Sequence, residues 1–215
     1  MKRSRPLNKT TRSITTIVGI LLAFAGFEHG LFAALQGNTP TNGYIIQAIG
    51  EDIRWWAYGT EEAFTVIPNF LVTGIAAMIV SAFIMIWSLY FISGTFGSRV
   101  FLLSFILLVL VGGGLGFILF FIPAWAYSRK INRSLDWWKR NLSAGRIQTL
   151  SRMWKSSLTI AIIFWLIAIE IAIFGYFPGT NDPEQLLSIC WGLLGISFVF
   201  MNVSFLAGYA KDIQE

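Results

Sequence analysis

Several stretches of twenty or more residues in this 215-residue chain carry almost no charged side chain. A helix of roughly 20 apolar residues spans the ~30 Å hydrocarbon core of a bilayer. Inside lipid the backbone must satisfy its own hydrogen bonds, which favours helices, and the ten-residue alternation of a membrane β-barrel is absent here. Charged residues make up 13% of the chain, well below the share in a soluble domain. The sequence therefore predicts an all-α, polytopic membrane bundle in one domain, residues 1–215.

Five apolar stretches alternate with polar or basic segments. The third stretch contains Gly112, Gly113 and Gly114 at its centre and Pro123 in its second half, and these residues predict a helix break. An acidic loop at 38–67 follows the first stretch and carries Trp55, Trp56 and Tyr58, which suit the headgroup level. The predicted spans cover about 14–37, 68–92, 100–127, 157–177 and 186–209.

Positive charge is concentrated in two segments, the leader at 1–13 and the segment at 129–155. Lys and Arg accumulate in short cytoplasmic loops, so both segments should face the same side. They do so if the third stretch enters the membrane and returns, which gives four full spans and a cytoplasmic N-terminus. The alternative is a fifth full span, a tilted helix whose glycines only allow close packing.

The basic segment at 129–155 has the pattern of two amphipathic helices separated by Gly145. Such a segment lies in the membrane interface with its cations toward anionic lipid headgroups. The predicted partners are thus the bilayer and its anionic headgroups, and not nucleic acid, because the basic residues flank apolar spans. The residues predicted to contact headgroups are Arg133, Lys139, Arg140 and Arg146.

Three ionisable residues fall within predicted spans: Glu28, His29 and Glu170. An ionisable group at the bilayer centre costs at least ~2.5 kcal/mol and normally faces protein or water. Glu28 and His29 are either a proton-titrating pair lining a polar cavity or groups reaching a wet vestibule. Glu170 is either a partner of His29 or a structural hydrogen-bonding group. Asn202 is a further candidate polar residue, for which an interhelical hydrogen bond is the simpler role.

Small residues recur along the first and last spans. Such residues let two helices approach closely, and they would also allow two copies of the chain to associate. The predicted helix-packing positions are Gly19, Gly26, Gly30, Gly192 and Gly195.

The composition argues against several classes of enzyme. One histidine cannot form the two-histidine zinc motif or the four-histidine ligation of a di-haem cytochrome, and the single Cys190 cannot form a redox pair. The phosphate-binding, dinucleotide-binding and serine-hydrolase motifs are also absent from the sequence. We therefore predict no cofactor, no metal and no catalytic residue.

Four short motifs in the first 125 residues resemble those of small multi-pass prokaryotic membrane proteins that have no assigned activity. The resemblance implies no ligand or catalytic residue, but it favours a bacterial or archaeal plasma membrane. The motifs are GFEHG at 26–30, LQGN at 35–38, IPNF at 67–70 with Thr73 and Gly74, and VGGG at 111–114.

Three classes of function remain open from the sequence. A small proton-linked transporter or channel would explain the ionisable residues and the glycine-broken stretch, since broken helices often build solute sites. A non-catalytic assembly, sensor or lipid-interacting protein would explain the basic segment and the small-residue faces. A membrane enzyme that uses Glu170 as acid or base is the third class.

Overall fold

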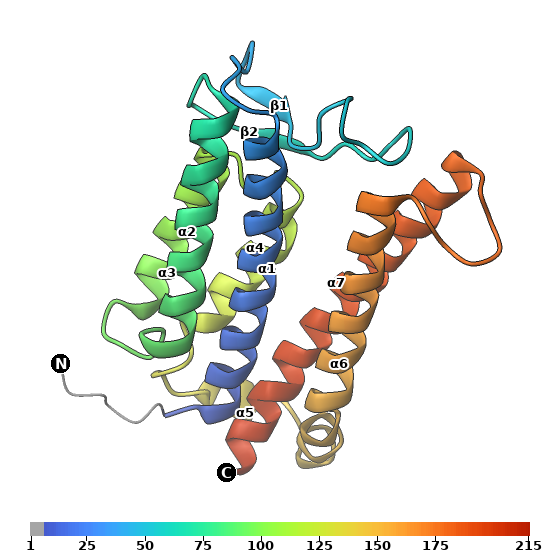
Figure 1. The fold of residues 1–215 in the computed structure, drawn as a ribbon. Coiled ribbons are helices and arrows are strands. Elements are labelled where there is room, and N and C mark those ends of the chain that lie inside the picture. Colours follow the sequence, from blue (N-terminus) through green and yellow to red (C-terminus); the bar gives the residue numbers. More distant parts are fainter. Residues whose placement is uncertain (1–6) are drawn as a thin grey trace.

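The computed structural model describes residues 7–215 (Figure 1), so the first six residues of the basic leader lie outside the described part. Within the described residues, seven helices and one small antiparallel sheet confirm the predicted all-α class. Their order is α1 (Lys9–Leu35), β1 (Ile45–Gln47), β2 (Glu62–Phe64), α2 (Phe70–Tyr90), α3 (Gly97–Leu110), α4 (Phe117–Ser128), α5 (Asp136–Asn141), α6 (Ala144–Phe174) and α7 (Pro183–Gln214).

Four of these helices, α1, α2, α6 and α7, are long and apolar enough to cross a membrane, which makes the chain a membrane protein. In contrast, α3 and α4 are shorter, with 14 and 12 residues. At about 1.5 Å per residue they are roughly 21 and 18 Å long, less than the ~30 Å hydrocarbon core.

The fourth span begins earlier in the chain than we predicted. We expected a separate amphipathic helix before residue 157, but α6 is continuous from Ala144 to Phe174. Ser143 caps the helix by accepting a hydrogen bond from the Arg146 backbone, so Gly145 falls in the first turn, where glycine does not interrupt the helix. Only the short α5 remains of the predicted pair.

The third apolar stretch forms a hairpin of α3 and α4. The Asn132 side chain donates to the Ser93 carbonyl at 2.8 Å, so the residues before α3 and after α4 lie side by side. The Asn8 backbone donates to the Ile131 carbonyl at 3.0 Å, which places the start of α1 there too. We call this the basic end of the bundle and the opposite end, where residues 36–69 lie, the loop end.

The tip of this hairpin, residues 111–116, has the backbone that the glycines predicted. Gly112 and Gly114 have φ values of +97° and +91°, a region that disfavours side chains with a Cβ. The Thr73 hydroxyl donates to the Val111 carbonyl at 2.8 Å, and the Leu115 N–H donates to the Glu62 carbonyl at 3.2 Å. Neighbouring elements thus satisfy the non-helical backbone.

We predicted that Pro123 would break the helix, and this prediction is wrong, because α4 continues through Pro123. Membrane helices tolerate a single proline, whereas the positive φ values at the tip end α3 outright. The break therefore depends on the glycines alone.

The glycine face of α1 packs closely against α2 and α3. A Cβ on Gly30 would lie 2.7 Å from the Gly74 carbonyl oxygen, so the two backbones touch at this crossing. Gly19 and Gly26 lie against side chains of both neighbours. Gly192 and Gly195 differ from our expectation, since a Cβ at either position would have no heavy atom within 4 Å.

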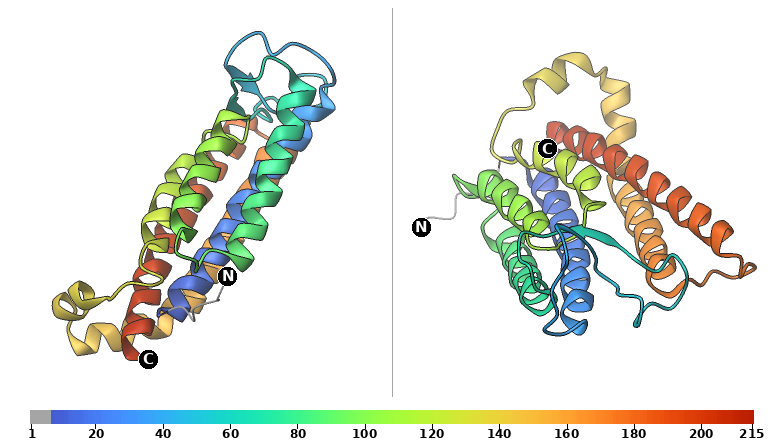
Figure 2. Two further views of the ribbon diagram at one scale, coloured as in Figure 1. Left: turned by 90° about the vertical axis from the view of Figure 1, so that its left-hand side faces the viewer. Right: turned by 90° about the horizontal axis from the view of Figure 1, so that it is seen from above.

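The apolar helices form two groups, α1 to α4 and the pair α6 and α7, which approach at the basic end (Figures 1 and 2). There the Asp212 carboxylate of α7 caps the start of α1. It accepts hydrogen bonds from the Thr10 N–H at 2.7 Å, the Thr11 N–H at 2.8 Å and the Thr11 hydroxyl at 2.7 Å. This cap joins the two groups at one end of the molecule.

At the loop end the two groups separate, and residues 48–61 extend from the sheet toward α6 (Figure 1). The Trp56 indole N–H donates to the Ala172 carbonyl at 3.0 Å. This loop therefore bridges the two helix groups. The two strands of three residues each, paired from Ile45–Phe64 to Gln47–Glu62, were not predicted.

Candidate functional site

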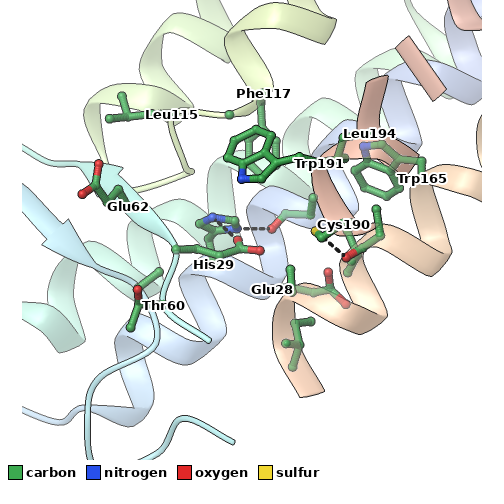
Figure 3. A pocket seen from close by; sticks show the side chains of 18 of the residues that line it. Glu28, His29, Thr60, Glu62, Leu115, Phe117, Trp165, Cys190, Trp191 and Leu194 are labelled. Atoms are coloured by element: carbon green, nitrogen blue, oxygen red, sulfur yellow. Dashed lines mark hydrogen bonds and ion pairs between the residues drawn. The ribbon is translucent and has the colours of Figure 1, made fainter. Parts of the chain in front are cut away.

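A cavity of about 730 Å³ lies between the two helix groups toward the loop end. Its walls come from α1, the bridging loop, the hairpin, α6 and α7 (Figure 3). The volume falls within the range of small-molecule sites, roughly 300–1,000 Å³. Most of the lining is apolar or aromatic, with a few polar groups from α1 and the loop.

His29 of α1 is buried at the wall of this cavity. Its Nδ1 lies 3.0 Å from the Ala25 carbonyl oxygen, which can only accept, so Nδ1 carries a proton. Its Nε2 faces the Glu61 carboxylate in an ion pair. A proton on Nε2, hydrogen-bonded to the Glu61 carboxylate, therefore connects α1 to the bridging loop.

Three elements meet at this pair. The Glu61 carbonyl accepts a hydrogen bond from the Ala48 N–H at 2.7 Å, which extends the pairing of the small sheet to the backbone of Glu61. At the hairpin tip, a Cβ on Gly114 would lie 2.6 Å from His29 Nε2. Beyond it, the Phe117 ring meets the imidazole edge to face, with centroids 4.9 Å apart. The glycine break thus brings the hairpin backbone against His29.

The electrostatics of the pair favour an ionised Glu61. Burial alone would raise the pKa of the Glu61 carboxyl, but the charge of His29 and its hydrogen bond hold that pKa below the ordinary value of 4.5. The loop is therefore held by a charge-assisted contact at neutral pH.

Glu28 also lines the cavity and is half-buried. In Figure 3 its side chain points from α1 toward α6. Among the described residues it makes no hydrogen bond or ion pair, in contrast to its neighbour His29. The structure thus brings Glu28 and His29 to one cavity, as the sequence suggested.

Glu170 and Asn202 lie elsewhere. Glu170 is exposed, because α6 turns Trp165, Ala168 and Ala172 toward the cavity and leaves the carboxylate on its other side. The pairing of Glu170 with His29 that we considered is therefore wrong, and His29 pairs with Glu61 instead. The Asn202 amide donates to the Phe198 carbonyl of its own helix at 2.8 Å.

Sequence reasoning missed Glu61 as a site residue. A histidine within a span needs a polar partner, and the adjacent loop is rich in carboxylates. That signal leaves four candidates, Glu51, Asp52, Glu61 and Glu62, and the sequence does not distinguish among them. The selection depends on the unpredicted sheet, which turns the chain back toward α1.

The residues predicted to contact lipid headgroups lie at the basic end. Arg133, Lys139, Arg140 and Arg146 are all exposed. Within residues 7–215, no group of three or more His, Cys, Asp or Glu side chains is arranged to hold a metal ion.

Comparisons of the chain with models of protein families, with curated proteins and with solved structures found no match. The site's own geometry is therefore the basis for any functional proposal.

Proposed function

We propose that this protein is a small-solute transporter of the prokaryotic plasma membrane, which takes its solute into the cavity beside His29. The observation that carries the proposal is the juxtaposition of a sizeable cavity, a proton-sharing pair and a glycine-broken hairpin. Broken helices that build a solute site between two helix groups are a recurrent design of secondary transporters.

The proposed orientation places the basic end in the cytoplasm and the loop end outside. Support comes from the positive-inside tendency, because Arg99 and the residues of 129–155 gather at one end of the bundle. Exposed Arg133, Lys139, Arg140 and Arg146 would then meet the anionic headgroups of the inner leaflet.

The proton shared by His29 and Glu61 supplies the proposed link to pH. With that proton present, the pair is complementary and the loop is held over the cavity. Without it, the carboxylate faces the Nε2 lone pair, because the Ala25 carbonyl keeps the other ring proton on Nδ1. The resulting repulsion would release the loop and open the cavity at the loop end.

Passage to the other side would require the two helix groups to change their relative angle. The hydrogen bonds from Thr10 and Thr11 to Asp212 close the basic end in this structure. We propose that rocking of α6 and α7 against the other helices weakens this cap while the loop end closes.

A panel of amines, amino acids, sugars and nucleosides tests the proposal in proteoliposomes on a solid-supported membrane. We expect at least one class to produce a transient current that depends on an imposed pH gradient. His29→Ala and Glu61→Gln should abolish that dependence. Glu170→Gln is the matched control, because Glu170 is exposed outside the cavity, and it should behave as the wild type.

Absence of current for every class would contradict transport. Binding of a solute without current would favour the alternative, a sensor in which an occupied cavity shifts the loop. The observation that favours this second function is that two side-chain contacts, from Trp56 and Glu61, hold the loop against the walls of the cavity.

A further inference from the structure

The charges of the cavity lining are unbalanced. The lining includes the carboxylates Glu28, Glu61 and Glu62, with His29 as the only group that can become positive, and no Lys or Arg. His29 is already paired with Glu61. The cavity therefore has an excess of negative charge that a bound cation would offset.

Glu28 is the carboxylate that a ligand could reach. It is half-buried at the cavity wall without a hydrogen-bond or ion-pair partner among the described residues. Besides the already paired His29, the charged groups that act on it are Glu61 and Glu170, both of its own sign. A half-buried carboxylate with only like charges around it, apart from a paired histidine, is stabilised when an opposite charge is placed against it.

The remaining wall suits an apolar body and a diffuse positive charge. Aromatic rings attract cations to their faces, and such rings surround quaternary ammonium groups in known recognition sites. The aromatic residues that line the cavity are Phe32, Trp56, Tyr58, Phe117, Phe120, Trp165, Trp191 and Phe198.

Two apolar side chains on the α4 and α7 walls of the cavity are largely exposed. Leu119 and Trp191 line it from these two helices, and both are exposed, at 65% and 64%. Both residues belong to apolar helices. A solute dissolved in the bilayer could therefore enter sideways without first crossing the loop.

From these four observations we propose that the cavity binds an amphipathic organic cation, with its positive charge beside Glu28 and its apolar body among the aromatic residues. The inference rests on the proposed solute site and names the class of its solute. It requires binding, not transport, so the two proposals can fail separately.

Two ions of the same shape and opposite charge, tetraphenylphosphonium and tetraphenylborate, test this inference. Cys190 lies in the cavity wall and is the only cysteine of the chain, so its rate of labelling reports occupancy. The reagent is the neutral methyl methanethiosulfonate, applied to the purified full chain at equal free concentrations of either ion. We expect tetraphenylphosphonium to slow the labelling and tetraphenylborate to have no effect.

Variants at Glu28 complete the test. Glu28→Gln should raise the concentration of tetraphenylphosphonium needed for half-protection by about tenfold, the effect of losing one charge-assisted contact. Glu28→Asp keeps the charge and should retain the preference for the cation, which guards against a folding defect in the Gln variant. Glu184→Gln should stay within about twofold of the wild type, because Glu184 is exposed and does not line the cavity.

Equal protection by the two ions, protection by neither, or an unchanged half-protection concentration in Glu28→Gln would overturn the inference. Each of these results would leave transport of an uncharged solute untouched, since solute-dependent currents test that separately. Cation protection that depends on Glu28, without any current, would support the inference and count against transport.

Discussion

His29 owes its role to the difference between its two ring nitrogens. The Ala25 carbonyl, one turn earlier in α1, holds a proton on Nδ1 and so turns Nε2 toward the loop. Glu61 lies 32 positions further along the chain and meets that nitrogen. One proton therefore decides whether the loop and α1 attract or repel each other.

The lowered pKa of Glu61 predicts how stability depends on pH. A carboxyl with a lower pKa in the folded state stabilises the fold above its unfolded-state pKa, and this contribution is lost as pH falls through the folded-state value. We expect the wild type to lose stability on acidification below about pH 4.5, its ordinary pKa. Glu61→Gln should be less stable at pH 7, by about 1–3 kcal/mol, and should change less with pH.

Thermal unfolding in detergent between pH 7 and pH 3 measures both effects. Glu62→Gln is the matched control, because Glu62 is the exposed neighbour and makes no ion pair with a described residue. Parallel pH profiles for wild type and Glu61→Gln would mean that the pair does not hold the loop.

At this scale the sequence predicted Glu28 and His29 because carboxylates and histidines are rare in apolar spans. It did not identify Glu61, because a loop residue's partner depends on the path of the loop, and three-residue strands give too little pattern to predict that path. Glu170 was misplaced for a different reason. Helical periodicity gives the angle between residues on α6, but not which side of α6 faces the other helices.

Among the elements, the hairpin of α3 and α4 determines the shape of the site. Its break was predictable because three consecutive glycines allow positive φ values, while the role of Pro123 was not, since one proline can remain within a helix. The length of α6 was missed because the amphipathic stripe before residue 157 continues into the apolar span without a break.

Gly114→Ala tests the hairpin tip. The substitution places a side chain at φ +91° and within 2.6 Å of His29 Nε2, so it adds backbone strain and displaces the imidazole. We expect a loss of about 1–3 kcal/mol in stability, measured by thermal unfolding. The loss should be smaller in a Glu61→Gln background, where the His29–Glu61 contact is already weakened.

Gly116→Ala is the control for the same segment. Gly116 has φ −60°, and a Cβ there would meet no heavy atom within 4 Å. It should leave stability unchanged within about 0.5 kcal/mol. Equal effects of the two substitutions would contradict the packing of the tip against His29.

For the whole molecule, the two helix groups meet at the basic end and enclose the cavity toward the loop end. The sequence predicted the number of long helices from charge-free length alone, which is a local property. It could not predict the separation into two groups, because that depends on which helix faces touch, for example the cap that Asp212 provides for α1.

The most direct test of transport is whether Cys190 can be reached from both sides of the membrane. A membrane-impermeant thiol reagent is applied to either side of oriented vesicles, and a cysteine at Lys139 in a Cys190→Ser background marks the side of the basic end. We predict that Cys190 becomes reactive from the loop end when alkaline pH on that side removes the proton shared by His29 and Glu61, and from the basic end under a pH gradient with solute present. Reaction from the loop end alone, under every gradient and with every solute, would contradict a transporter.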